Sequence, residues 1–405
     1  MDTIKISAPG KVMLCGAYVV LERPNPALVV SVSARFTVNV QRDNGTPGVE
    51  VSCPQISAKG QYDFRFLDEG GFELVLVRGT SVGAFVESAL LTAVFAAYLY
   101  TSRQSVLSAL RKGLRILVEG DEEFYTKENG KTGLGSSAAV VAATVAGICT
   151  SLGWQGDTHA ASQTAHCIAQ HKIGSGFDIS AAVRGSQRYI RFPPGRIPLE
   201  GISARPGFIR VQSEACLDLT DLGETCDQLE LPQGWDLVLG QVASGSSTPS
   251  MVKKVLSYKN SPDPDAQKLW QAVISSNNEV ELAIRKGSVD ESKSTFARYR
   301  KYLRELGDKS GAPIEPAEIR PILDETCKVQ GVIHAGVPGA GGFDSICALI
   351  ENSSARERVE VVSALCPKKA EKLDAWYKAL TFLARHFLFW PCVSISFGRV
   401  WELTL

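Results

Sequence analysis

The stretch Lys131-Thr-Gly-Leu-Gly-Ser-Ser-Ala138 decides the fold, because it predicts a glycine loop that opens onto a helix. Gly133 and Gly135 lack a Cβ atom, so the backbone there can take positive φ angles and approach a ligand closely. Ser136 and Ser137 are candidate N-caps for the helix, and an apolar stretch follows them. A buried helix with an open N-terminus predicts a binding site for an anion such as phosphate.

Other interpretations of this loop stay open at this point. The pattern Gly133-x-Gly135-x-x-Ala138, with Asp157 beyond it, fits a loose dinucleotide-binding fingerprint. That fingerprint needs a strand directly before the loop, whereas the sequence 123–131 is polar and typical of a turn. The P-loop pattern G-x-x-x-x-G-K-[ST] occurs nowhere in the sequence. The structural alternative is a tight turn that only caps a core helix.

Length and composition exclude several classes of protein. The chain has 405 residues, enough for two domains or one large one, and 44% hydrophobic with 21% charged residues is typical of a soluble globular protein. Acidic and basic residues balance at 43 each, which argues against a nucleic-acid or membrane partner. The first residues lack the apolar region of a signal peptide, so we expect a cytoplasmic protein with reduced, mostly buried cysteines.

Hydrophobic periodicity predicts a mixture of strands and helices in two domains. In the first half we expect a turn at Pro9-Gly10, strands over 4–8, 28–40, 49–52, 62–67, 72–77, 114–119 and 186–192, and helices over 83–100, 138–149 and 158–171. In the second half we expect strands over 235–242, 331–335, 345–351 and 393–402, and helices over 263–285, 288–306, 315–329, 357–364 and 369–385. The irregular segment 193–231 predicts a domain boundary that separates 1–230 from 231–405.

Three further features add polar groups that could carry chemistry. Lys11 follows a Pro-Gly pair amid apolar residues, where a lysine can face a ligand or extend its ammonium to solvent. Asp178 lies at the start of a small-residue helix, where it can serve a reaction or act as an N-cap. The hydroxyl-rich turn Ser244–Thr248 starts another helix that could bind an anion.

The order and spacing of three segments resemble the motifs of the GHMP kinases, which include galactokinase, homoserine kinase, mevalonate kinase and phosphomevalonate kinase. These segments are Pro9-Gly-Lys11…Gly16, Gly133-Leu-Gly-Ser-Ser-Ala138 and Gly336-Val-Pro-Gly-Ala-Gly-Gly342. Within the superfamily, Lys172-Ile-Gly-Ser-Gly-Phe-Asp178 and the continuation of the third segment to Asp344 resemble the fungal and plant type of phosphomevalonate kinase. The resemblance covers nearly the whole chain.

The resemblance implies an α+β fold with two domains, the GHMP kinase fold. Its N-terminal domain is ribosomal-S5-domain-2-like and its C-terminal domain is ferredoxin-like, with ATP and the phosphate acceptor in the cleft between them. The implied reaction transfers the γ-phosphoryl group of ATP to (R)-5-phosphomevalonate and gives 5-diphosphomevalonate, a step toward isoprenoids and sterols. The resemblance also implies a Mg²⁺ ion and either a monomer or a homodimer.

The family's functional residues carry over onto matching positions of this sequence. The implied catalytic residues are Lys11 and Asp178, and the implied Mg²⁺ ligand is Ser137. The implied ATP-binding residues are Lys131, Thr132, Gly133, Leu134, Gly135, Ser136, Ser137 and Ala138. The implied substrate-binding residues are Lys11, Tyr18, Ser175, Ser247, Gly339 and Gly341.

Two departures from the family pattern limit what carries over. The first motif reads Gly16-Ala17-Tyr18, where the family usually has a glutamate in the middle. The segment Ala165–Gln170 holds no acid, although mevalonate kinases have a metal-binding glutamate there, so a second Mg²⁺ ligand is unidentified. Two alternatives therefore stay open: a kinase of the same family that acts on mevalonate or a sugar, and a non-catalytic sensor of ATP and a metabolite.

The chemistry of the implied acceptor changes the role expected of Asp178. A phosphate monoester has its second pKa near ~6, so it is largely a dianion at neutral pH and hardly needs a general base. Our hypothesis is that Asp178 mainly orients Lys11 and the acceptor.

Overall fold

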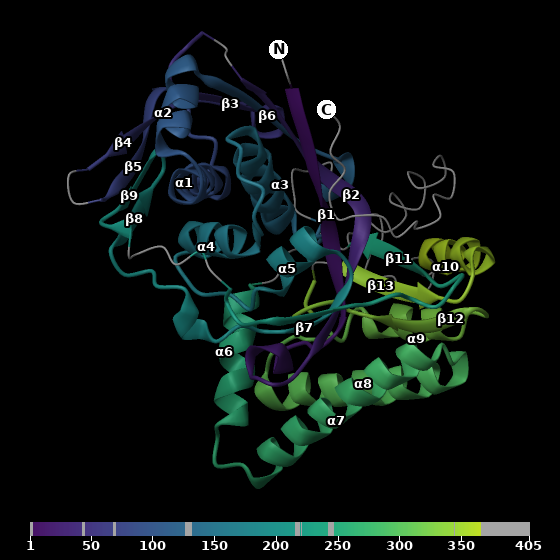
Figure 1. Ribbon diagram of the computed structural model, residues 1–405. Helices are drawn as coiled ribbons and strands as arrows, with labels where there is room; N and C mark the ends of the chain where they lie inside the picture. The colour runs from purple at the N-terminus through teal and green to yellow at the C-terminus, as the bar shows by residue number, and fades with distance from the viewer. Residues whose placement is uncertain are drawn as a thin grey trace.

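The computed structural model describes residues 3–42, 45–67, 70–125, 132–214, 219, 221–241, 247–343 and 345–365. Two β-sheets organise these residues (Figure 1). A 10-stranded sheet has the order β10-β7-β2-β6-β3-β4-β5-β9-β8, with β1 paired to β2 off this path. A 3-stranded sheet has the order β11-β13-β12. The predicted helix over 369–385 and strand over 393–402 lie outside the described residues.

The large sheet uses strands from the first 230 residues. They are β1 (Thr3–Cys15), β2 (Ala27–Arg42), β3 (Val49–Cys53), β4 (Ala58–Phe66), β5 (Phe72–Gly79), β6 (Leu114–Gly120), β7 (Gln187–Ile190), β8 (Ile202–Arg205), β9 (Phe208–Val211) and β10 (Thr225–Gln228). The long hairpin β1–β2 is antiparallel. From Ala34 to Gln41, residues of β2 alternate between buried and partly exposed because successive side chains face opposite sides of the sheet.

The turn predicted at Pro9-Gly10 is wrong, because β1 continues through these residues. The register of β1 against β2 shifts between Pro9 and Lys11 and again between Met13 and Cys15. Proline cannot donate to a ladder, and an irregularity of this kind accommodates it without ending the strand. The strand therefore carries Lys11 within its own length, opposite Ser31 of β2.

Helices cover the large sheet and share the core of this half with its strands. They are α1 (Ala84–Tyr100), α2 (Arg103–Lys112), α3 (Ser136–Ser151), α4 (His159–Gln170) and α5 (Phe177–Arg184). Helix α3 packs on β1 and β2, and α1 packs on α3 and α4. The apolar stretch predicted to be buried is buried, since Ala138 and Val141 are both 0% exposed. The sequence does not predict helix α2, because this stretch is charged and only weakly apolar.

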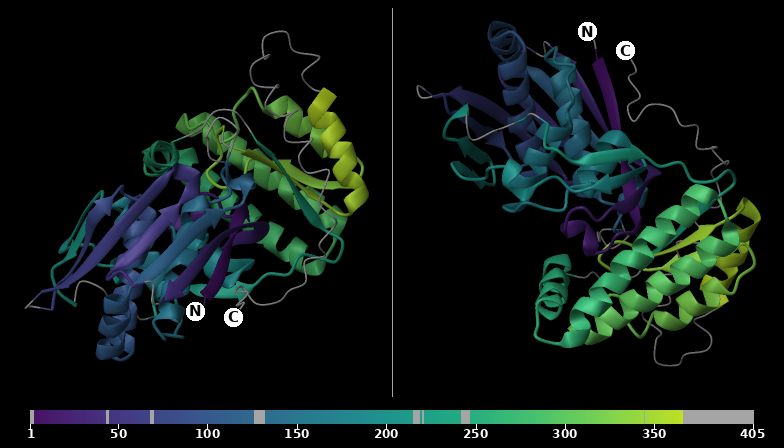
Figure 2. Two further views of the ribbon diagram at one scale, coloured as in Figure 1. Left: turned by 90° about the horizontal axis from the view of Figure 1, so that it is seen from above. Right: turned by 60° about the horizontal axis from the view of Figure 1, so that its bottom comes forward.

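The second half packs helices on the small sheet, as the lower part of Figure 2 (right) shows. Its strands are β11 (Asp236–Gln241), β12 (Val332–Gly336) and β13 (Ser345–Ile350). Its helices are α6 (Thr248–Lys259), α7 (Pro264–Lys286), α8 (Val289–Ser310), α9 (Arg320–Cys327) and α10 (Ser353–Leu365). Short 3-10 turns lie at Val19–Leu21, Pro54–Ile56, Glu122–Phe124 and Pro194–Arg196.

Each sheet draws its described strands from one side of residue 230, although the domain boundary itself stays a prediction. A hydrogen-bonded contact joins the two halves at the first motif. The Tyr299 hydroxyl of α8 accepts the backbone N–H groups of Gly16 and Ala17, at 3.0 and 3.1 Å. The phenol is buried, and burial raises its pKa, so it stays neutral.

Two expectations from composition can be compared with the described residues. The cysteines described are free thiols, and five of them, at positions 15, 53, 149, 167 and 347, are buried. Within the same part of the chain, no helix combines the length and the apolarity that a membrane crossing requires.

Candidate active site

Strand β1 brings Lys11 against the glycine loop. The backbone N–H of Lys11 donates to the carbonyl oxygen of Leu134 at 2.8 Å, and its Nζ donates to that of Gly133 at 3.2 Å. The ammonium also lies 5.5 Å from the ring centre of Phe177, the first residue of α5. Lys11, which was expected to be catalytic, thus lies beside the loop that was expected to bind ATP.

Two features of position 135, its backbone conformation and the nearby side chain of Lys11, require a glycine there. Its φ is +78°, a left-handed angle that side chains with a Cβ rarely adopt. A Cβ atom at this position would lie 2.8 Å from Cε of Lys11. The glycine therefore lets the lysine stem pass directly over the loop.

Helix α3 starts differently from the sequence-based expectation. Its N-cap is Gly135, and no side chain caps it, so the prediction that Ser136 or Ser137 is the N-cap is wrong. Both serines are instead the first helical residues. The N-cap position before them has a left-handed φ angle, which a glycine takes readily. Ala138 and Ala139 donate to the Gly135 carbonyl, at 3.0 and 3.2 Å. The N–H groups before them precede the first helical hydrogen bond and can meet an anion.

Asp178 lies in the first turn of α5, next to the residue that touches Lys11. The N-cap of this helix is Gly176, so the alternative in which Asp178 caps the helix is wrong. Its side chain is 23% exposed, and Oδ2 lies 3.8 Å from Nε2 of His166. Asp178 is thus reachable by a ligand while one oxygen stays close to a buried imidazole.

His166 was missed by the sequence analysis, which searched Ala165–Gln170 only for an acid. Its Nε2 lies 3.2 Å from Oγ of Ser137, so one ring nitrogen is close to both predicted site residues, Ser137 and Asp178. Burial lowers the pKa of His166, against the raising effect of Asp178, which favours a neutral imidazole. No local pattern marks His166 as a site residue, because both partners lie on other helices, α3 and α5.

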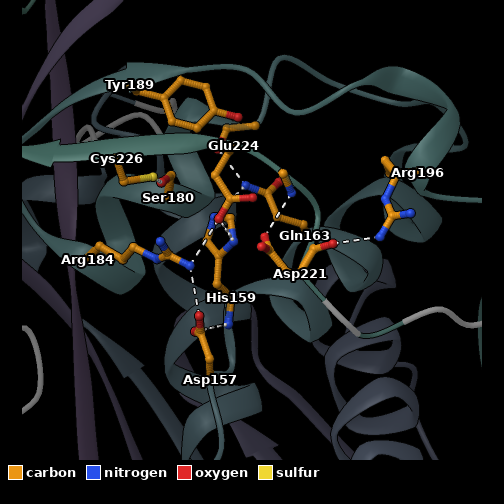
Figure 3. Close-up of polar contacts among 12 residues, drawn as sticks. Asp157, His159, Gln163, Ser180, Arg184, Tyr189, Arg196, Asp221, Glu224 and Cys226 are labelled. Atoms are coloured by element: carbon orange, nitrogen blue, oxygen red, sulfur yellow. Dashed lines mark hydrogen bonds and ion pairs between the residues drawn. The ribbon is translucent and has the colours of Figure 1, made fainter.

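Buried side chains hold the loop before Asp178 by its carbonyl groups. The carbonyl oxygen of Gly174 accepts from Arg191 at 2.7 Å, and that of Ser175 accepts from the Tyr189 hydroxyl at 3.0 Å. The carbonyl oxygen of Gly176 accepts from Nε2 of Gln163 at 2.7 Å. Figure 3 shows the side chains of Gln163, which belongs to α4, and Tyr189, which belongs to β7. Three successive carbonyl groups are therefore fixed, and with them the start of α5.

The third motif meets the first through Tyr18. Its hydroxyl donates to the carbonyl oxygen of Ala340 at 2.6 Å, and burial raises the pKa of the phenol. A Cβ atom at Gly341 would lie 2.1 Å from the carbonyl oxygen of Ile314, whereas one at Gly339 would meet no atom within 4 Å. Gly341 is therefore needed for close backbone packing, and Gly339 borders open space.

The remaining predicted site residues range from buried to exposed. Ser175 is partly buried and its carbonyl group is already engaged, as described above. Ser247 is the exposed N-cap of α6. Thr132 is buried, and its Oγ1 has no hydrogen-bond partner among the described residues. Lys131, Asp344 and the start of the turn, 244–246, lie outside the described residues.

Family models match both halves of the chain. The model described as "GHMP kinases N terminal domain" matches residues 93–186, which include the glycine loop and Asp178. The model described as "GHMP kinases C terminal" matches residues 289–368. The solved Streptococcus pneumoniae phosphomevalonate kinase in complex with phosphomevalonate and AMPPNP has the same fold, with a TM-score of 0.63 at 17% identity over 89% of this chain and 96% of that one.

Curated relatives are more similar in sequence and cover most of both chains. The phosphomevalonate kinase ERG8 of Gibberella zeae is 34% identical, over 89% of this chain and 90% of the relative. The peroxisomal phosphomevalonate kinase of Arabidopsis thaliana is 30% identical, over 88% of this chain and 92% of the relative. The chain therefore belongs to the GHMP kinase family, in the group that contains the fungal and plant phosphomevalonate kinases.

Proposed function

We propose that this protein is a phosphomevalonate kinase, which transfers the γ-phosphoryl group of ATP to the phosphate of (R)-5-phosphomevalonate. The products are ADP and 5-diphosphomevalonate. The curated relatives with this activity in their names align along most of the chain, which supports the choice of acceptor over mevalonate or a sugar. The relative solved with AMPPNP and phosphomevalonate supports ATP as the donor.

One observation carries the proposal: the Lys11 ammonium lies 3.2 Å from a carbonyl oxygen of the glycine loop, at the tip of α3. Phosphoryl transfer needs positioning and neutralisation of charge more than covalent chemistry from the protein. The N–H groups at the start of α3 can hold the phosphates of ATP, and Lys11 can offset the repulsion between donor and acceptor phosphates. Asp178, whose helix starts beside Lys11, can orient the acceptor.

The residues around the helix tip fit a magnesium ion that arrives with ATP. Mg²⁺ prefers oxygen ligands, keeps several waters and takes few ligands from the protein when a nucleotide is bound. The oxygen atoms of Ser137 and Asp178 suit it, and both lie near the same nitrogen of His166, at 3.2 and 3.8 Å. The described residues contain no group of three or more His, Cys, Asp or Glu side chains that could hold a metal by itself, in keeping with a site completed by phosphates. When bound, Mg²⁺ supplies positive charge to the transferring phosphoryl group.

For the acceptor we propose contacts from Lys11, Tyr18, Ser175, Ser247, Gly339 and Gly341. Gly339 is the best placed of the glycines, because the space beside it is open. Tyr18 already donates to Ala340, so its contribution to the acceptor would come from holding the third motif in place. A cytoplasmic location also stays a prediction, which fluorescence microscopy of the tagged protein would test.

A coupled ADP-release assay tests the proposal with ATP, Mg²⁺ and one acceptor at a time. We expect turnover with (R)-5-phosphomevalonate and little with mevalonate or galactose. Turnover of mevalonate alone would overturn the choice of acceptor. Ligand-induced thermal shifts without ADP release from any acceptor would favour the sensor over the enzyme.

A further inference from the structure

His166 contacts two predicted site residues that come from different helices, and its own environment fixes the ring. It belongs to α4, Ser137 to the start of α3 and Asp178 to the start of α5. The ring centre lies 5.4 Å from that of Phe85, on α1, and the residue is 4% exposed. A buried ring held by an aromatic neighbour has little freedom to turn.

The hydrogen-bond pattern indicates which nitrogen of His166 carries the proton. The amide nitrogen of Gln170 lies 2.7 Å from Nδ1 and 2.9 Å from Nε2 of the ring. An amide nitrogen only donates, and we assign its hydrogen bond to the nearer ring nitrogen, Nδ1, and therefore the hydrogen of the ring to Nε2. The Nε2–H group then points toward Oγ of Ser137, with Asp178 as its second neighbour.

This arrangement sets the direction of the Ser137 hydroxyl. With the hydrogen assigned to Nε2, Oγ accepts from it through one lone pair, which leaves the hydroxyl hydrogen and the second lone pair for the space at the helix tip. Without His166, the hydroxyl could rotate or bond within its own helix, as serine hydroxyls commonly do.

We propose that His166 is a positioning residue for nucleotide binding, which acts by fixing the Ser137 hydroxyl at the start of α3 and holding Asp178 beside it. The inference rests on the proposed function for its choice of ligand. It gives the segment Ala165–Gln170, which lacks an acid, a role at the site: the histidine acts on the ligand through Ser137 instead of touching it. Groups that orient a metal ligand typically contribute about 10- to 100-fold to metal affinity or to activity.

The test is a double-mutant cycle that measures binding of Mg²⁺-AMPPNP by calorimetry, with melting curves for every variant. We expect His166→Leu to weaken binding about 10- to 100-fold, and His166→Gln to stay within about threefold, because the glutamine amide can replace Nε2–H. In a Ser137→Ala background, His166→Leu should add less than about twofold, since its partner is already gone. The exposed His171, the C-cap of α4 with φ of 52°, provides the control His171→Asn, which should bind as the wild type does.

Equal effects of His166→Leu with and without Ser137, or wild-type binding by His166→Leu, would overturn the proposal. If the leucine variant melts below the assay temperature, His166→Asn replaces it, because asparagine keeps a polar group but is too short to reach Ser137. The cycle needs no acceptor. A protein that binds Mg²⁺-AMPPNP but never phosphorylates 5-phosphomevalonate would therefore refute the proposed function and still decide the role of His166.

Discussion

The two ends of helix α4 each carry a buried histidine beside a carboxylate, in opposite surroundings. At the start of the helix, Nδ1 of His159 lies 2.9 Å from Oε1 of Glu224, and both side chains are 2% exposed. Near its end, Nε2 of His166 lies 3.8 Å from Oδ2 of Asp178, whose side chain is 23% exposed. The first pair is close and enclosed, whereas the second is looser and open on the carboxylate side.

The groups around the two histidine–carboxylate pairs also differ: charged side chains surround the first pair, and an open helix start borders the second. Glu224 also binds Arg184 at 3.0 Å, and Arg184 reaches Asp157 at 2.8 Å, so the first pair belongs to a network of charges (Figure 3). The second pair is completed by Ser137 at a helix tip that no side chain caps. The contrast suggests that a histidine–carboxylate pair has a structural role when protein groups enclose it, and can serve a ligand when one side stays open. Four measurements test this comparison.

The largest expected effect is at Lys11, whose ammonium lies beside Phe177, the residue before Asp178 of the open pair. Lys11→Met keeps the stem that passes over Gly135 and deletes the charge. We expect kcat with (R)-5-phosphomevalonate to fall about a thousandfold, because a fixed cation stabilises charge in the transition state, while the unfolding free energy changes little. Lys5→Met, at an exposed position of the same strand, is the matched control and should keep wild-type kcat. If Lys11→Met lowered the unfolding free energy enough to explain the loss of kcat, Lys11 would have a structural role.

On the enclosed side the expected effect is on stability. Glu224→Gln removes the charge of a buried carboxylate, whose Oε1 contacts both His159 and Arg184. We expect the unfolding free energy from urea denaturation at pH 7 to fall by about 3 kcal/mol, with kcat of the folded protein unchanged. Glu230→Gln, at an exposed position nearby, should change neither quantity. A large fall in kcat without destabilisation would contradict the division between the two ends of α4.

Acid should remove the same contribution from the wild-type protein. Burial by itself would raise the pKa of Glu224, but the hydrogen bond and charge of His159, with Arg184, outweigh it and lower the pKa from 4.5 to about 2. A carboxylate with a lowered pKa stabilises the fold fully above its unfolded-state pKa and loses this contribution as pH falls toward its folded-state pKa. The difference in unfolding free energy between wild type and Glu224→Gln should therefore shrink by about 2 kcal/mol from pH 7 to about pH 3. A difference that stays constant over this range would mean that Glu224 is not held ionised by its neighbours.

The sequence could predict the open side because its function depends on local backbone geometry. Gly133 and Gly135 stand out in a sequence, and so does a lysine after a Pro-Gly pair. The start of α3 was misplaced because serines and glycines both favour helix starts, and only the φ of Gly135 decides between them. Lys11 and the loop are far apart in the chain, and their contact was expected only through the family resemblance.

The enclosed side could not be predicted in the same way. Glu224 lies in a segment that the sequence analysis described only as irregular, and its partners come from α4 and α5. A lone glutamate there is typical of an exposed loop, and only the pairing of β10 with β7 shows that the chain returns to the sheet nearby. His166 was missed for a related reason: its partners are Ser137 and Asp178, and tertiary packing alone brings the three together.

The smallest expected effect tests what Asp178 contributes on the open side. Asp178→Asn keeps the size of the side chain and one oxygen near His166, while it removes the negative charge and the ability to take a proton. If the acceptor is a phosphate dianion, no base is needed, and kcat should fall less than about tenfold in steady-state assays with (R)-5-phosphomevalonate. Asp227→Asn, on the exposed edge strand β10, is the control for a lost surface carboxylate. A fall beyond about a thousandfold would mean that Asp178 takes part in the chemical step, and the open end of α4 would then hold a catalytic acid or base in addition to groups that position a ligand.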